Sequence, residues 1–130
     1  MSKKINLSFG AFELHEHHAV GIINEGVDLM SKENKDLINI CQNYYASTPF
    51  GYISYRLNSY SVDPTVYIET GKLPNLVAIA VVISEPAQKL SATIEKIFFE
   101  KPFEYFNSLE EAQRWIHNIV VITNQQEKTR

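Results

Sequence analysis

The chain has 130 residues, a formal net charge of −3 at pH 7, 45% hydrophobic residues and 21% charged residues. This length fits one compact domain, and the composition excludes a mainly disordered chain. The acidic balance offers no general attraction for nucleic acid, so we expect no nucleic-acid partner. The single cysteine, Cys41, cannot form an internal disulfide, which favours a reducing, cytoplasmic location.

The chain carries no pattern typical of a membrane anchor or a signal peptide. Its longest apolar run, residues 76–83, has eight residues, far fewer than a bilayer-spanning helix needs. The first residues alternate between polar and apolar and lack the apolar core of a signal peptide. We therefore expect no transmembrane segment. We expect one domain over residues 1–122 and a flexible tail over residues 123–130, which lack apolar anchors.

The first half of the chain predicts a β-meander that leads into a helix and a further strand. Alternation of apolar and polar residues is typical of strands that bury one face, whereas a spacing of three and four indicates a helix. We expect antiparallel strands over 5–9, 12–14 and 19–23, a helix over 31–46 and a strand over 50–55. Cys41 falls on the apolar face of this helix, as a buried and inert thiol.

The second half predicts alternating helices and strands. We expect a short helix from Asp63-Pro64, a strand over 76–83, a helix from Ser84, a short strand over 103–106 and a last helix over 109–120. The apolar stripe of the helix after Ser84, formed by Leu90, Ile94, Ile97 and Phe98, should face the core. The predicted class is α/β, with a mixed sheet opened by an antiparallel meander, continued by parallel strands and packed with about four helices.

Two blocks carry a resemblance to a known family. The closing pattern combines Phe103-Glu104-Tyr105-Phe106, Ser108-Leu109-Glu110-Glu111-Ala112 and Trp115-Ile116, and the other block runs from Tyr52 to Pro64. With the order of elements, they resemble STAS domains, and more closely the small bacterial proteins likened to the sporulation anti-sigma-factor antagonist, stage II protein AA. The resemblance covers about Ile5 to Val120 and implies a STAS-like fold.

The resemblance also implies a regulatory role. In the best-understood members, a partner kinase phosphorylates a serine at the start of a helix after a central strand, which controls partner binding. The matching place here is the loop over residues 56–63, where Ser59 and Ser61 are the candidate phosphoacceptors. The usual Asp-Ser/Thr-x-Gly motif is absent, since no glycine occurs between Tyr52 and Thr70. Related folds include lipid-carrying domains, which implies an apolar or lipid-like ligand as another role.

The residues of the same loop independently indicate a binding site. The loop leaves the carboxyl end of a predicted strand and enters the start of a helix, a position where α/β sheets bind ligands and where anions are favoured. The candidate ligand or phospho-switch residues are Arg56, Asn58, Ser59, Tyr60, Ser61 and Asp63. The structural alternative is that Asp63 caps its helix, Arg56 forms an ion pair and Tyr60 packs against the core.

The remaining chemically suggestive residues favour structural roles. His15 and His17 would share one face of a strand, but the sequence gives no reason for Cys41 or His117 to lie nearby, so we expect a solvated turn and no metal site. Glu110 and Glu111 fit a capping box. No nucleophile elbow, phosphate-binding loop or dinucleotide motif occurs, so we expect no cofactor and no catalytic residues.

The sequence therefore predicts a non-enzymatic, cytoplasmic regulatory or ligand-binding domain. It would act through residues 56–63 on a protein partner or on a small anionic or lipid-like ligand. One alternative is a small enzyme that uses the same loop as an anion site. Another is a structural domain that forms a homodimer, as many small α/β domains do.

Overall fold

The computed structural model describes residues 2–128. Its elements follow one another as β1 (Lys3–Leu7), β2 (Gly10–Leu14), β3 (His18–Ile23), β4 (Asp28–Leu29), α1 (Ser31–Tyr45), β5 (Phe50–Tyr55), β6 (Ser61–Val62), α2 (Val66–Thr70), β7 (Leu76–Val82), α3 (Pro86–Lys96), β8 (Phe103–Phe106) and α4 (Leu109–Lys128). The predicted meander and the later alternation of helices and strands are both confirmed.

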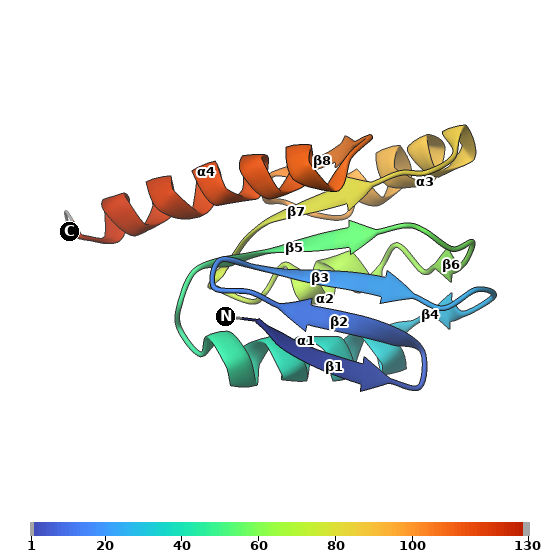
Figure 1. Ribbon diagram of the computed structural model, residues 1–130, viewed down its shortest axis with the longest axis horizontal. Coiled ribbons are helices and arrows are strands. Elements are labelled where there is room, and N and C mark those ends of the chain that lie inside the picture. The colour runs from blue at the N-terminus through green and yellow to red at the C-terminus, as the bar shows by residue number, and fades with distance from the viewer. Residues whose placement is uncertain (1, 129–130) are drawn as a thin grey trace.

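Six strands form one mixed sheet in the order β1-β2-β3-β5-β7-β8 (Figure 1). β1, β2 and β3 pair antiparallel, whereas β3, β5, β7 and β8 pair parallel. The parallel strands all end at the same edge of the sheet, and the crossovers bring the loop after β5 and the start of α3 to that edge. A second, two-stranded parallel sheet joins β4 to β6, and no pattern in the sequence predicts it.

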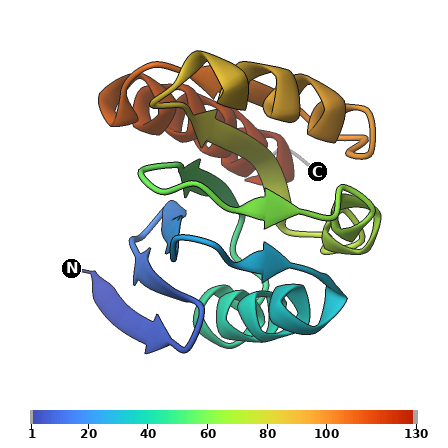
Figure 2. The same ribbon diagram turned by 90° about the vertical axis from the view of Figure 1, so that its right-hand side faces the viewer.

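The two faces of the sheet carry separate layers of helices (Figure 2). Along β7 the side chains alternate: Ile79 and Val81 pack with the buried residues of α1, α2 and α3, whereas Ala78 and Ala80 pack under α4. Both faces of this strand are therefore covered, as its apolar sequence predicted. Cys41 is buried in the first layer, where burial raises the pKa of its thiol to about 12.

The helix α4 approaches the sheet closely because glycine and alanine lie beneath it. A Cβ atom added at Gly51 would lie 2.4 Å from Ile116 Cγ2, so no side chain fits at that position of β5. Ala112, Ile116 and Val120 of α4 are buried against the sheet. The helix continues to Lys128, so residues 123–128 are helical, and residues 129–130 lie outside the described part. Mobility of this end of the chain stays a prediction.

The predicted orientation of α3 is wrong for Leu90, Ile94 and Ile97, whereas Phe98, just after the helix, is half-buried and packs against the core as predicted. Leu90, Ile94 and Ile97 are 67%, 44% and 78% exposed, whereas the buried residues of this helix are Ala92 and Glu95. The inward stripe thus carries a small residue and a carboxylate, and the aliphatic stripe faces outward. The reason is that Glu95 points inward to form an ion pair with Arg56, the residue that follows β5.

Candidate functional site

The loop over residues 56–63 forms one wall of an open groove, and one face of α3, from Ala87 to Glu95, forms the other. The groove has a volume of about 360 Å³. Five of the six predicted site residues line it: Arg56, Asn58, Ser59, Tyr60 and Ser61. The groove lies at the carboxyl ends of the parallel strands β5 and β7, where α/β sheets commonly bind ligands.

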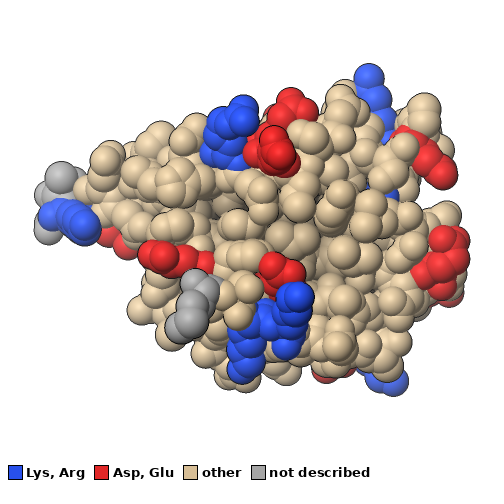
Figure 3. All heavy atoms as spheres, in the orientation of Figure 1, with Lys and Arg blue, Asp and Glu red and all other residues tan. Residues whose placement is uncertain are grey.

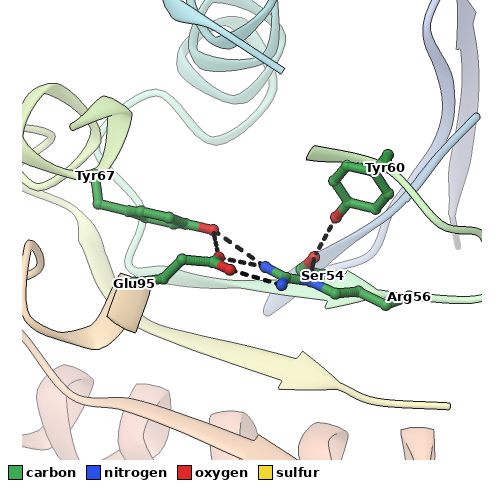
Figure 4. A network of polar contacts seen from close by, with 5 residues as sticks. All are labelled: Ser54, Arg56, Tyr60, Tyr67 and Glu95. Atoms are coloured by element: carbon green, nitrogen blue, oxygen red, sulfur yellow. Dashed lines mark hydrogen bonds and ion pairs between the residues drawn. The ribbon is translucent and has the colours of Figure 1, made fainter. Parts of the chain in front are cut away.

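Arg56 extends from the end of β5 into a buried polar network (Figure 4). Its guanidinium forms a bidentate ion pair with Glu95 of α3, in which Nη1 lies 2.7 Å from Oε2 and Nη2 contacts Oε1. Nε donates to Ser54 Oγ at 3.2 Å, and Nη2 donates to Tyr67 Oη at 3.4 Å. Tyr67 in turn donates to Glu95.

The network is buried and electrically balanced. Arg56 is 4% exposed and Glu95 is 3% exposed. Burial is the largest single effect and opposes the charge on the guanidinium. The hydrogen bonds to Glu95, together with the electrostatic interactions with Tyr67, Tyr60 and Glu95, outweigh burial, so the pKa of Arg56 is raised overall. Burial, and then the charge of Glu95, raises the pKa of Tyr67 well above its usual value. The guanidinium of Arg56 is therefore bound to Glu95 inside the protein, which is the ion pair that the structural alternative predicted.

The other predicted site residues are held by neighbouring segments. Asn58 Nδ2 donates to the carbonyl of Ile23 at 2.9 Å. The amide of Ser59 donates to Glu25 Oε1 at 3.0 Å, and the hydroxyl of Ser61 donates to Asp28 Oδ1. The loop is therefore pinned to the segment between β3 and α1, while the side chains of Ser59 and Ser61 remain exposed.

Asp63 caps the turn that leads into α2. Its Oδ1 accepts hydrogen bonds from the amide of Thr65 at 3.0 Å and from Thr65 Oγ1 at 2.8 Å. The helix itself begins at Val66, two residues after Pro64. Asp63 therefore caps this turn and not α2 itself, whose N-cap is Thr65, so the helix-capping role of the structural alternative is wrong.

The surroundings of the loop are acidic. Its hydrogen-bond donors face the carboxylates of Glu25 and Asp28, and Glu85 stands at the mouth of the groove. Figure 3 shows acidic side chains along the right-hand edge, the end at which β3 and β5 finish in Figure 1. Among the described residues, the only cation that lines the groove is Arg56, which Glu95 neutralises. This arrangement favours a cationic or uncharged group in the groove over an anion.

Tyr60 separates the groove from the protein interior. Its hydroxyl and Ser54 Oγ lie 3.0 Å apart, and its ring lies 5.7 Å from Arg56 Cζ. Tyr60 and Val62 also line a largely apolar interior cavity of about 40 Å³ between α1 and β5. A cavity of this size holds about one water molecule and no acyl chain.

Three residues of the network were not predicted: Ser54, Tyr67 and Glu95. The one sequence signal for Glu95 is that Gln88, Ala92, Glu95 and Phe99 also recur with helical spacing. Nothing in the sequence connects this second stripe to Arg56, because the pairing depends on a crossover of 39 residues.

The described residues contain no group of three or more histidine, cysteine or acidic side chains placed to hold a metal ion. The expectation that His117 would lie away from His17 is wrong, because the two rings lie 5.3 Å apart. The helices of the described part include none that is both long enough and apolar enough to cross a membrane.

No family model matches the sequence, and no curated protein matches it significantly. The fold, however, is similar to that of a solved structure of an uncharacterised protein of the DUF3478 family, with a SpoIIAA-like fold, from Shewanella loihica PV-4. The TM-score is 0.56 with 10% sequence identity, over 89% of this chain and 92% of that chain. The protein therefore has a SpoIIAA-like fold, and the STAS-like architecture implied by the sequence is confirmed.

Proposed function

We propose that this protein is a non-enzymatic regulatory domain that binds a protein partner through the 56–63 loop and the adjoining groove. The observation that carries the proposal is the groove itself, which opens at the carboxyl ends of β5 and β7. The loop contributes polar side chains to its lining, and the α3 wall presents Ile94, which is 44% exposed. A surface that combines an apolar wall with polar loop atoms suits a protein segment.

The charges near the groove favour a partner with basic side chains. Glu25, Asp28, Asp63 and Glu85 all lie on or beside the loop, and Arg56 is neutralised by Glu95. A basic segment with apolar residues would pair with these carboxylates and cover Ile94. A small anion has less support, because the amide of Ser59 and the hydroxyl of Ser61 already donate to carboxylates.

A catalytic role for the groove has less support than a binding role. The strongest candidate acid–base pair, Tyr67 and Glu95, is buried and bound to Arg56 in a closed network. An enzyme would need one of these groups to reach the substrate. We place the domain in the cytoplasm, with homodimer formation as an alternative role that needs no other partner.

Site-specific crosslinking tests the proposal. A photoreactive phenylalanine analogue is placed at Ser59, in the loop, and at Asp36, an exposed residue of α1, as the matched control. In living cells of the native host, we expect Ser59 to crosslink one protein that Asp36 does not. The purified protein should then bind the wild-type domain and lose at least tenfold in affinity with Ile94→Gln.

Three results would overturn the proposal. The first is an identical set of crosslinked proteins from both positions. The second is that inorganic phosphate shifts the NMR signals of amides 56–63 at sub-millimolar concentration, which indicates an anion site. The third is that the Ser59 probe crosslinks only a second copy of this chain, which indicates a homodimer.

A further inference from the structure

All four histidines of the chain gather at the end of the sheet opposite the groove. The sequence contains four histidines in total. His15 and His17 lie in the turn between β2 and β3, His18 begins β3, and His117 lies on α4 about a hundred residues later. The cluster therefore joins the β-meander to the only described helix on that face of the sheet.

The four rings form two contacting pairs. The rings of His15 and His18 stack with their centroids 4.7 Å apart, and those of His17 and His117 meet edge to face at 5.3 Å. Gln113 of α4 adds a polar contact, in which its Nε2 lies 3.4 Å from His18 Nε2. This contact connects α4 directly to the first residue of β3.

The surroundings of His18 disfavour an added proton. Burial, and then the neighbouring His15, His17 and His117, lowers the pKa of His18 to about 4. His17 Nδ1 is buried without a hydrogen-bond partner, so a proton there would be a buried donor with no acceptor.

The carboxylates of this region pair with other rings. Glu13 Oε1 lies 2.9 Å from His15 Nε2, and Glu16 Oε1 lies 3.6 Å from His17 Nε2. From α1, the hydroxyl of Tyr45 donates to the backbone oxygen of His15 at 2.7 Å. The two carboxylates therefore face His15 and His17. His18, between the turn and α4, has no carboxylate in these pairs.

We propose that the four-histidine cluster is a proton-sensitive contact, which holds the β2–β3 turn against α4 when the imidazoles are neutral and releases it on mild acidification. Protonated rings would repel one another at the two ring contacts. The segment that responds is the middle of α4, where Ile116 packs on Gly51 beside the cluster. Its release would expose apolar surface that α4 buries at neutral pH.

The expected effect follows from the difference between the unfolded and folded pKa of His18. A free histidine titrates near pH 6.5, whereas His18 titrates near pH 4 in the folded protein. Opening of the contact should therefore become more favourable as the pH falls below 6.5. Between pH 7.5 and 5 the equilibrium constant for opening should rise by roughly 30-fold at most.

Hydrogen exchange tests the proposal. Exchange of amides 15–18 and 113–120 is measured from pH 7.5 to 5, corrected for the intrinsic pH dependence of exchange and referred to the amides of α1. We expect protection in both segments to fall together below pH 6.5. His18→Gln and the surface variant His117→Gln should each weaken this response, whereas Glu104→Gln, which breaks the exposed Lys96–Glu104 pair, should keep it.

Two results would overturn the proposal. One is that protection of amides 113–120 stays constant to pH 5, or falls equally in His117→Gln and wild type. The other is that micromolar Zn²⁺, added at pH 7.5, stops the NMR signals of the four imidazoles from changing as the pH is lowered. That result would make the cluster a metal site. The variant at His117 keeps the test usable even if His18→Gln fails to fold, because His117 is exposed.

Discussion

The Arg56–Glu95 pair places two charges in the interior, and its role follows from the cost of desolvation. Each charge loses its hydration, and the bidentate geometry together with Ser54 and Tyr67 replaces it. Such a pair contributes little net stability relative to apolar residues of similar size, but breaking it leaves one charge alone in the interior. Arg56, which the sequence suggested as an anion ligand, is therefore expected to affect the free energy of unfolding.

The first prediction concerns this pair. Arg56→Met should lower the free energy of unfolding by about 3–5 kcal/mol, because Glu95 is left buried and unpaired. The double variant Arg56→Met/Glu95→Leu should recover most of the loss. Urea unfolding of the three proteins measures both effects. A loss below about 1 kcal/mol in the single variant, accompanied by weaker phosphate binding, would instead make Arg56 a ligand residue.

Among the elements, the six strands of the main sheet were predicted well, whereas the orientation of α3 was not, for a physical reason. A strand such as β7 is recognised from a run of apolar residues, and its burial on both faces follows from that run. A helix with two stripes is ambiguous: the aliphatic stripe of Leu90, Ile94 and Ile97 competes with the stripe that contains Ala92 and Glu95. Which stripe faces the core depends on Arg56, which follows β5 and pairs with Glu95. The spacing of residues within α3 carries no information about this partner.

The same limit applies to β4 and β6. Each has two residues, too few for a periodic signal, and they form only because the loop after β5 meets the segment after β3. For this reason the sequence located the candidate site in the 56–63 loop but missed the residues that hold the loop in place. It also missed the approach of His117 to His17, which depends on how α4 crosses the sheet.

The second prediction tests the orientation of α3. Leu90→Gln and Ile97→Gln should change the free energy of unfolding by no more than about 0.5 kcal/mol, because both side chains are exposed. The comparison is Ile116→Ala in α4, which is fully buried and should cost about 2–5 kcal/mol. Thermal and urea unfolding measure both. A loss above 2 kcal/mol in Leu90→Gln would contradict the outward orientation of this stripe.

The third prediction concerns the β4–β6 pair. A phosphate or a phosphomimetic residue at Ser61 would face Asp28, which now accepts the hydrogen bond of the Ser61 hydroxyl. Ser61→Glu should therefore weaken this pair and lower protection of the Ser61 and Asp63 amides, which donate to Val27 and Leu29, by about tenfold. Ser61→Ala, which adds no charge, is the control. Equal protection in the two variants would show that charge repulsion does not act here.

At the scale of the whole molecule, burial of His18 makes global stability depend on pH. The pKa of His18 is lowered to about 4 by burial and by the neighbouring histidines. In the folded state this ring stays neutral, whereas the unfolded chain takes up a proton below pH 6.5. The stability that the neutral ring contributes is therefore fully present above pH 6.5 and is lost as the pH falls toward 4.

The fourth prediction follows from this dependence. The free energy of unfolding should fall by roughly 1–3 kcal/mol between pH 7 and pH 4.5, and His18→Gln should remove most of that change. Urea unfolding at intervals of half a pH unit measures it. A wild-type curve that is flat from pH 7 to 5 and falls only where carboxylates titrate would rule out the contribution of His18.

The strand β5 connects the two regions of interest. Its six residues span about 20 Å, with Gly51 beside the histidines at one end and Arg56 following the other. Substitutions on one side are thus too distant to touch the opposite side directly, and their effects on free energy should simply add. A variant made to test partner binding at the 56–63 loop should therefore keep the wild-type pH response of the histidines. A variant made to test that pH response should likewise keep partner binding.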